Sequence, residues 1–448
     1  MDRSSGPRLG SREGLTLDPS PINLRDHRGR PLTRALRVAI AGGGARGSAY
    51  ARHLDESGGK AVVGAVAEPR DAIRFAMGVR YAIPKGAQFA DWRDLVAAPR
   101  SCDAVVISLQ DSEHLEAATA FAAAGYDILL EKPMAPTQAE CRRIVAATES
   151  ANVWLGVCHV LRYTPYTSLV RSLVAGGAIG DIVNVQHLEP VGFWHFAHSY
   201  VRGNWRSEAT SAPVLLTKSS HDIDWLSYII GRPATRVSSF GSLLHFRPEH
   251  APAGAAERCL DCAVEDTCAF SAMRIYRAGL TPERRESYFT AVVAPEYNED
   301  ALTRALRNGP YGRCVYSGQN DVADHQVVSI EYEGGVTAGF TLTAFSPMEN
   351  RRTRIFGTQG QIATDGNTVE LYDFRSGSTT VHEAVSGGVS AGEGHAGGDG
   401  AMIKAFVRAL CDGEPSHFSS DGLTSLTTHE IVFAAEEARL RGTVVSLA

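Results

Sequence analysis

Residues 42–47 read GGGARG, which is a G-x-G-x-x-G loop. The loop follows an apolar stretch at 37–41 (RVAIA) and precedes a helix-compatible run at 48–54 (SAYARHL). The loop alone would be weak evidence, but a strand, a glycine loop and a helix in this order are typical of a dinucleotide-binding unit. The stretch therefore predicts an α/β domain that binds a dinucleotide cofactor.

Each position of this loop has a physical role in such a site. Gly42 would allow the tight turn, Gly44 would let the backbone approach a pyrophosphate, and Gly47 would permit close packing of the helix on the strand. The pyrophosphate would lie at the free N–H groups of the helix start, near Ala45 and Arg46, where the helix dipole favours an anion.

An acidic residue closes the next apolar strand. That strand spans 61–67 (AVVGAVA), and Glu68 follows it. A carboxylate at this place accepts hydrogen bonds from the ribose hydroxyls and repels a 2′-phosphate, so NAD is predicted over NADP. Arg70, two residues on, weakens this preference.

From about residue 36 to 158, continuous apolar strands alternate with amphipathic helices, which predicts a doubly wound parallel sheet. A second apolar strand in this region ends in Glu131-Lys132-Pro133. The chain here resembles the glucose–fructose oxidoreductase / inositol dehydrogenase (Gfo/Idh/MocA) family. The resemblance covers about residues 36 to 445, through the segments 103–109 (DAVVISL), 128–133 (ILLEKP), 156–163 (GVCHVLRY), 179–182 (IGDI), 221–224 (HDID) and 357–360 (GTQG).

The resemblance implies a Rossmann NAD-binding domain followed by an α+β domain with a large open mixed or antiparallel sheet. It implies NAD(P)-dependent hydride transfer to or from a ring carbon of a sugar, cyclitol or related polyol. It also implies that His114 and Glu131 border the cofactor, and that Lys132 and His221 supply the proton that moves with the hydride.

The chain departs from the family pattern next to the histidine. The usual aspartate four residues before it is Thr217 here, and Lys218 follows. Without that carboxylate, His221 is expected to titrate differently, with Asp222 or Asp224 as orienting groups.

Of the 44 basic residues only five are lysines, at positions 60, 85, 132, 218 and 404. Because lysine, unlike arginine, can be tuned to exchange a proton, Lys132 and Lys218 are predicted to be catalytic together with His221.

The predicted organisation has four parts. Residues 1–33 form a flexible arm, 34–158 the Rossmann domain, 159–420 the substrate and oligomerisation domain, and 421–448 a C-terminal helix that packs back on the body. The second domain contains a cysteine-rich excursion at 246–280. Its strand-like segments lie at 182–188, 235–245, 326–333, 336–345, 352–356, 361–364 and 368–373. The resemblance places the open face of this sheet in a subunit interface, which implies a homodimer or homotetramer.

The stretch 193–206 (FWHFAHSYVRGNWR) interleaves aromatic and polar side chains. Aromatic faces stack on sugar rings while polar groups bond their hydroxyls, so a carbohydrate pocket is favoured over core packing. Arg202, Arg206 and Lys218 would also suit an anionic sugar. The glycine-rich segment 386–400 is predicted to be a mobile loop, plausible as a lid. The predicted substrate contacts are Arg162, Tyr163, Trp194, His195, His198, Arg202, Trp205, Asp222 and His395.

Four cysteines form a separate constellation. Cys259, Cys262 and Cys268 have the spacing C-x2-C-x5-C, and Cys314 follows. In a cytoplasmic chain this spacing favours a closed structural zinc site over buried or redox thiols, and both over an iron–sulfur cluster. The histidines at 245 and 250 are substitute ligands.

The net charge and the hydropathy of the chain argue against other classes of protein. The net charge of −6 and the absence of a basic stretch argue against a nucleic-acid partner. No apolar run reaches membrane length and no signal-peptide core is present, so a cytoplasmic protein without a membrane partner is expected.

Two enzyme functions remain. The first is an NAD-dependent dehydrogenase that oxidises a sugar hydroxyl. The alternative is a redox-neutral NAD-dependent glycosidase, which oxidises, eliminates the aglycone, adds water and returns the hydride. A cofactor-bound regulator is a weaker alternative, since Lys132 and His221 are both present.

Overall fold

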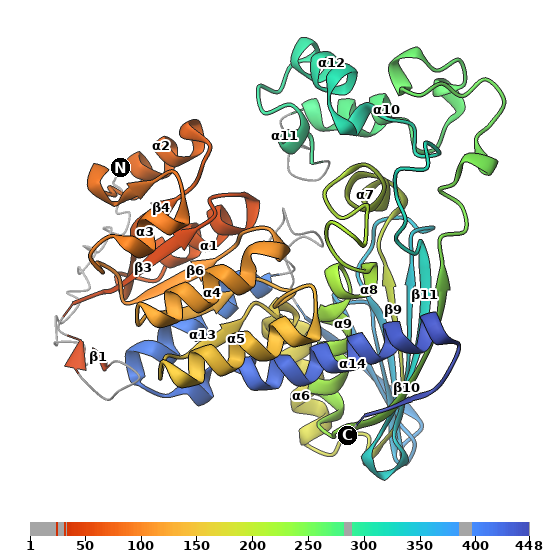
Figure 1. Ribbon diagram of the computed structural model, residues 1–448. Coiled ribbons are helices and arrows are strands. Elements are labelled where there is room, and N and C mark those ends of the chain that lie inside the picture. The colour runs from red at the N-terminus through yellow and green to blue at the C-terminus, as the bar shows by residue number, and fades with distance from the viewer. Residues whose placement is uncertain (1–23, 26–30, 33, 282–288, 385–396, 448) are drawn as a thin grey trace, which may run out of the picture.

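The structure is a computed structural model that describes residues 24–25, 31–32, 34–281, 289–384 and 397–447. Its elements form two domains, one built on a six-stranded parallel sheet and one on a nine-stranded mixed sheet. Figure 1 shows the parallel sheet with its helices beside the larger sheet. The predictions of a flexible arm at 1–33 and of a lid containing His395 fall mostly on residues outside this description.

The parallel sheet has the strand order β5-β4-β3-β6-β7-β8. Its strands are almost wholly buried because helices cover both faces, as their continuous apolar sequences require. The order reverses between β3 and β6, and ligands bind outside the carboxyl ends of the strands at such a switch point. The strands are β3 (Leu36–Ala41), β4 (Ala61–Ala67), β5 (Gln88–Phe89), β6 (Ala104–Ile107), β7 (Asp127–Leu130) and β8 (Leu155–Val157), with helices α1 (Ala45–Asp55), α2 (Asp71–Arg80), α3 (Trp92–Ala97), α4 (His114–Ala123) and α5 (Gln138–Ser150).

The second sheet has the order β16-β15-β14-β13-β9-β12-β11-β10-β17, in which β9 and β12 pair in parallel and the other neighbours antiparallel. Its strands are β9 (Ile182–Pro190), β10 (Ala234–Ser242), β11 (His325–Tyr332), β12 (Thr337–Thr343), β13 (Arg352–Gly357), β14 (Gly360–Thr364), β15 (Thr368–Asp373), β16 (Ser378–Glu383) and β17 (Val445–Ser446). The fold class is therefore the predicted one.

Helices α9 (Ser220–Ile230) and α14 (Gly422–Arg441) cover the face of this sheet that looks toward the Rossmann domain (Figure 1). Trp225 of α9 is fully buried there and stacks on His187 of β9 at a ring distance of 5.0 Å. Alternate residues along the same strands point to the opposite face and are exposed. The helices α6 (Pro165–Ala175), α7 (Phe193–Phe196) and α8 (Val214–Thr217) lie around this layer.

The cysteine-rich excursion is longer than the predicted 246–280. Helices α10 (Ala272–Arg277), α11 (Thr290–Val293) and α12 (Glu299–Asn308) form a small subdomain, seen above the rest of the chain in Figure 1. It has a hydrophobic core of its own, with Tyr276 and Leu302 fully buried. The chain then returns to the sheet at β11.

The C-terminal part departs from the predicted boundary at residue 420. Helix α13 (Gly398–Asp412) packs on α1, and its Met402 and Phe406 share a core with Ile40 of β3. Residues 398–412 therefore belong to the Rossmann domain. Helix α14 contacts α5 of that domain as well as α9 and β10 of the other, so it ties the two together. Among the described residues, no helix has the length and apolarity needed to cross a bilayer.

Candidate functional site

The glycine loop connects β3 to α1 at the switch point. Gly42 has φ +94°, and a Cβ on it would lie 2.3 Å from the carbonyl oxygen of Ser108, which follows β6. A Cβ on Gly47 would lie 1.9 Å from the Gly42 oxygen. Only glycine fits at these two places, because the loop presses against both its neighbouring strand and itself.

The first turn of α1 has the features of an anion site. Gly44 caps it with no side-chain hydrogen bond, and the turn contains no acidic residue. The space that a Gly44 Cβ would occupy is open, with the nearest heavy atom, an Arg70 nitrogen, 3.6 Å away. The N–H groups of the turn, which Ala45 and Arg46 begin, can therefore bind a pyrophosphate.

Glu68 lies beside this turn, almost fully buried. Its carboxylate accepts hydrogen bonds from the Gly43 amide and the Arg70 amide, both at 2.9 Å, and from the Arg70 guanidinium. Burial opposes ionisation, but the Arg70 and Gly43 hydrogen bonds outweigh it and lower the pKa of Glu68. Glu68 is therefore an ionised carboxylate at the carboxyl end of β4, where the ribose contact was predicted, and Arg70 is paired with it.

The Arg46 side chain turns away from the pyrophosphate position and toward Glu131. Its Nε donates to Glu131 Oε1 at 2.8 Å, and its Nη2 donates to Asp399 Oδ1 at 2.7 Å. Tyr50 Oη donates to the same Glu131 oxygen at 2.5 Å. Asp399 is fully buried at the start of α13, so this contact fixes the glycine loop to a helix some 350 residues later.

Lys132 follows β7 and reaches the second domain. Its Nζ donates to the carbonyl oxygen of Thr217 at 2.6 Å, where α8 ends. Burial lowers the pKa of Lys132 to about 8; the ammonium of Lys218 acts in the same sense, while Glu131 and Asp111 oppose it. An amine with this pKa can accept and donate a proton near neutral pH.

Asp111 is a site residue that the sequence analysis missed. It lies in the loop after β6, is buried, and accepts a hydrogen bond from Trp205 Nε1 at 3.1 Å. Burial raises its pKa, although the charges of His114 and Lys132 oppose the shift. His114 itself donates from Nδ1 to the carbonyl of Pro133 at 2.8 Å. A carboxylate four residues beyond the end of a buried parallel strand was the available signal for Asp111.

His221 lies in the first turn of α9 and is buried. It comes four residues after Thr217, whose carbonyl holds Lys132, so Lys132 and His221 are both at the corner between α8 and α9. Its ring is 5.9 Å from that of His159, and burial lowers the pKa of His159 to about 3. His159 is therefore a neutral neighbour.

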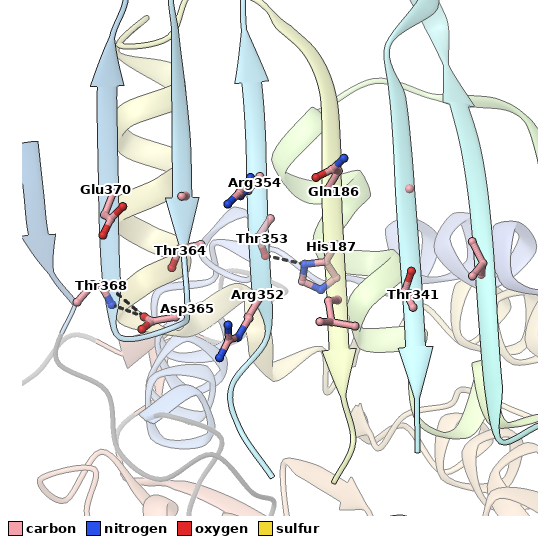
Figure 2. Close-up of a pocket in the computed structure, with 14 residues that line it drawn as sticks. Gln186, His187, Thr341, Arg352, Thr353, Arg354, Thr364, Asp365, Thr368 and Glu370 are labelled. Atoms are coloured by element: carbon pink, nitrogen blue, oxygen red, sulfur yellow. Dashed lines mark hydrogen bonds between the residues drawn. The ribbon is translucent and has the colours of Figure 1, made fainter. Parts of the chain in front are cut away.

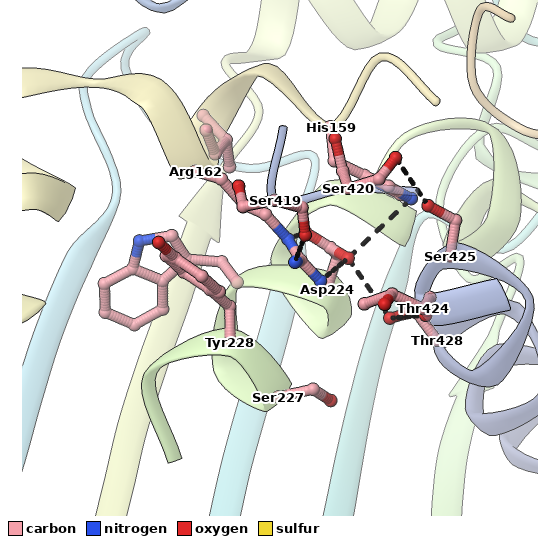
Figure 3. Close-up of polar contacts among 12 residues, drawn as sticks. His159, Arg162, Asp224, Ser227, Tyr228, Ser419, Ser420, Thr424, Ser425 and Thr428 are labelled. Carbon is pink, nitrogen blue, oxygen red and sulfur yellow. Dashed lines mark hydrogen bonds and ion pairs between the residues drawn. The ribbon is translucent and has the colours of Figure 1, made fainter. Parts of the chain in front are cut away.

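The two aspartates expected to orient His221 are engaged with other partners. Asp224 forms a bidentate ion pair with Arg162 at 2.7 Å, within a buried network that joins α9 to residues 419–428 (Figure 3). Asp222 binds Arg351 at 2.5 Å and His187 at 3.1 Å. The structure thus places Arg162 in the junction between the domains rather than with the predicted substrate contacts.

Lys218 belongs to a charge cluster that no sequence pattern indicated. Its Nζ lies 3.1 Å from Glu189 at the end of β9, and Glu189 also pairs with Arg351 at 3.0 Å. With Asp222, the cluster holds two cations and two carboxylates. The cluster is therefore neutral as a whole. Lys218 is already paired within it and is not a free cation that could bind an anionic substrate.

The aromatic stretch is divided between two places. Trp205 reaches Asp111 at the site, whereas His198 stacks between Phe289 at 4.8 Å and Tyr311 at 4.7 Å in the excursion. Burial lowers the pKa of His198 to about 3, so it is a neutral packing residue.

Three further predicted substrate contacts are in contact with other parts of the protein. Trp194 and His195 also face Phe289, with ring distances of 5.6 and 5.1 Å. Tyr163 donates to or accepts from Ser420 Oγ at 3.0 Å in the interdomain junction. Trp194, His195 and His198 therefore pack against the excursion, and their predicted contact with a sugar stays a prediction.

A separate hollow of about 610 Å³ lies on the other face of the nine-stranded sheet. Figure 2 shows Gln186, Arg352, Arg354 and Glu370 among the residues that line it. Because α9, which carries His221, packs on the opposite face, this hollow is not part of the site around Lys132.

The four cysteines of the predicted zinc site line one small cavity together with Arg202. In the portion of the chain that the structure describes, no three His, Cys, Asp or Glu side chains are arranged as metal ligands. The preformed tetrahedral site is therefore absent, and the Arg202 guanidinium, 3.6 Å from Cys259 Sγ, lies among the sulfurs. His245, a substitute ligand, is bonded to Tyr316 Oη at 3.1 Å.

Two family models match this chain. One is described as an oxidoreductase family, NAD-binding Rossmann fold, and covers residues 36–159; the other is the C-terminal alpha/beta domain of the same oxidoreductase family and covers residues 171–439. Together they span both domains of the structure.

Curated relatives are distant. The oxidoreductase YteT of Bacillus subtilis (strain 168) is 22% identical over 322 residues, which cover 67% of this chain and 71% of that protein. Inositol 2-dehydrogenase 2 of Paenarthrobacter aurescens (strain TC1) is 29% identical over 45% of this chain, and the match spans 58% of that dehydrogenase. Beyond YteT, the chain spans about half the length of the curated relatives it matches first.

Solved structures share the fold. A levoglucosan dehydrogenase in complex with NADH and levoglucosan has a TM-score of 0.67 at 18% identity, over 92% of this chain and 99% of that one. An oxidoreductase from Agrobacterium radiobacter in complex with NAD+, L-tartaric acid and magnesium has a TM-score of 0.66 at 16% identity. The match covers 92% of this chain and 98% of that one.

Proposed function

Because the chain belongs to the Gfo/Idh/MocA oxidoreductase family, we propose that it is an NAD-dependent dehydrogenase acting on a ring hydroxyl of a neutral sugar or cyclitol. The observation that carries this proposal is Lys132. Its amine lies at the junction of the two domains and has a pKa of about 8. A group with this pKa can take the hydroxyl proton as the hydride leaves.

The residues around the glycine loop fit the cofactor. The uncapped start of α1 suits the pyrophosphate, and the ionised Glu68 suits an unphosphorylated ribose. NAD, when bound, would supply the acceptor for the hydride. Because Arg70 is already paired with Glu68, we propose a preference for NAD over NADP.

The role of each residue follows from its contacts. The carbonyl of Thr217 holds Lys132 Nζ in place, and Asp111 offers a buried carboxyl close to it. Lys218 adds positive charge that keeps the Lys132 ammonium acidic. His221 is at the same corner, where it contacts the substrate hydroxyl or passes the proton that this hydroxyl releases on to water.

The charges favour an uncharged substrate. Lys218 and Arg351 are both paired with carboxylates, and Arg202 lies in the cysteine cavity. An anionic sugar would need a free cation, whereas the hydroxyls of a neutral polyol can donate to Glu189 and Asp111. We therefore propose a neutral substrate over the anionic alternative.

The test is an assay of NADH absorbance and of products with free sugars, cyclitols and their glycosides. A dehydrogenase forms one NADH for each oxidised product. Release of an aglycone over many turnovers without NADH, lost in both Lys132→Met and His221→Ala, would replace the proposal with the redox-neutral glycosidase.

A further inference from the structure

Four cysteines from different parts of the excursion surround one cavity. Cys259 begins a short 3₁₀ turn and Cys262 ends it, Cys268 follows a second turn, and Cys314 comes from the returning arm. The arm is held in place because Cys314 N donates to the Glu257 carbonyl at 2.8 Å. The cavity between the side chains has a volume of about 10 Å³, the size of one small ion or water.

A buried cation lies in the same cavity. Arg202 is 2% exposed; its Nε donates to the Arg313 carbonyl at 2.7 Å and its Nη2 to the Phe270 carbonyl at 2.8 Å. Its Nη1 is buried and, within the described residues, has no hydrogen-bond partner. Glu265 also lines the cavity, but Ser271 bonds to its carboxylate.

Glu265 lines the same cavity as Arg202 but is not its ion-pair partner among the described residues. No ion pair with a carboxylate is formed by Arg202 among the residues that the structure places, although a buried guanidinium is costly unless an anion compensates it. The cysteine sulfurs are the groups that can supply one, since Nη2 lies 3.6 Å from Cys259 Sγ.

We propose that Cys259, Cys262, Cys268 and Cys314 bind one zinc ion as thiolates, with Arg202 as the charge-compensating donor to the sulfurs. Binding releases four thiol protons to water, and a divalent ion with four thiolates carries a net charge of −2. Arg202 reduces this charge to −1. The ion would draw together side chains that do not yet form a metal site in the structure.

Such a site would be structural. Four protein ligands leave no position for water or substrate, so the ion contributes folding energy and takes no part in hydride transfer. The excursion has few long helices and a small core, which is the situation in which a metal crosslink adds most. The proposal is independent of the dehydrogenase activity.

The first experiment uses the full chain without any variant. Protein purified with a reductant and no chelator is analysed for metals, and the apo protein is titrated with cobalt(II) chloride. We expect about one zinc per chain and visible bands typical of a tetrahedral cobalt tetrathiolate. Absence of metal with four freely titrating thiols, iron with acid-labile sulfide, or disulfides in the peptide map would each overturn the proposal.

Variants then test the individual roles. Cys262→Ser should lose the zinc, whereas Cys141→Ser, which removes a buried thiol of the Rossmann domain, should keep it. Arg202→Met should speed zinc loss to a chelator by at least tenfold, and Arg206→Met, the matched control, should not. Equal rates for the two arginine variants would refute the role of Arg202.

Discussion

At the scale of single residues, the proposed hydride transfer depends on the protonation state of Lys132. Its folded pKa of about 8 lies below the usual lysine value, so the amine becomes neutral as the pH rises through 8. A general base acts in its neutral form; the rate of hydroxyl oxidation should therefore increase with pH up to about 8 and then level off. The check is kcat/KM measured from pH 6 to 10.

Lys132→Met should lower kcat by about 10³-fold, because general-base catalysis contributes on this order. The affinity for NAD, measured by fluorescence titration, should stay within a few fold, since the glycine loop holds the dinucleotide. Unchanged turnover would remove Lys132 from the mechanism. Lys60→Met serves as the control, because this lysine lies on the surface.

Glu68→Ala should narrow the preference for NAD over NADP. The substitution removes the repulsive carboxylate and releases the Arg70 guanidinium that it binds. The ratio of kcat/KM for the two cofactors measures the change, and Glu68→Gln tests charge at constant size. A wild-type enzyme that already prefers NADP would contradict the assignment of Glu68.

The motif residues could be predicted from the sequence because their positions are local to strand ends. Glu68 and Lys132 each follow a buried strand, and the structure brings both to the carboxyl edge of the parallel sheet. Glu189 and Arg351 could not be predicted, since they meet only through the pairing of β9 with β13. The packing of residues 194–198 on Phe289 could not be predicted, because stacking on a sugar and stacking on a phenyl ring have the same sequence pattern.

At the scale of elements, the contact between α1 and α13 is held by Arg46 and Asp399. Asp399→Asn leaves Arg46 with one carboxylate fewer in a largely buried place, and should lower the free energy of unfolding by about 3 kcal/mol. The measurement is chemical denaturation. Asp412→Asn, at the exposed end of the same helix, is the control and should change it by less than about 0.5 kcal/mol.

The predicted strand segments correspond to β9 to β15, because each alternates buried and exposed residues. Strand β16 was not predicted, because its residues are almost all exposed and so carry no such alternation. The boundary predicted at residue 420 put the residues of α13 in the second domain, since the apolar face of a helix does not say which domain will cover it.

At the scale of the whole molecule, the uncovered face of the large sheet predicts self-association. Phe240 is 73% exposed and pairs across strands with Val327, which is also exposed. Exposed apolar surface of this kind marks an interaction site. Phe240→Glu should shift the protein to a smaller oligomer in light scattering while its circular dichroism stays unchanged; a wild-type monomer would contradict this prediction.

The path of the chain also determines how the two domains move. The backbone leaves the Rossmann domain after β8, re-enters it at α13, and leaves it again along α14, which lies against both. Two domains that are joined by a single linker can rotate about it as about a hinge. Three chain connections between the domains restrict such a rotation. We expect the two domains to keep a nearly constant relative orientation when ligands bind, so that the proposed enzyme selects its substrate by fit to a preformed site.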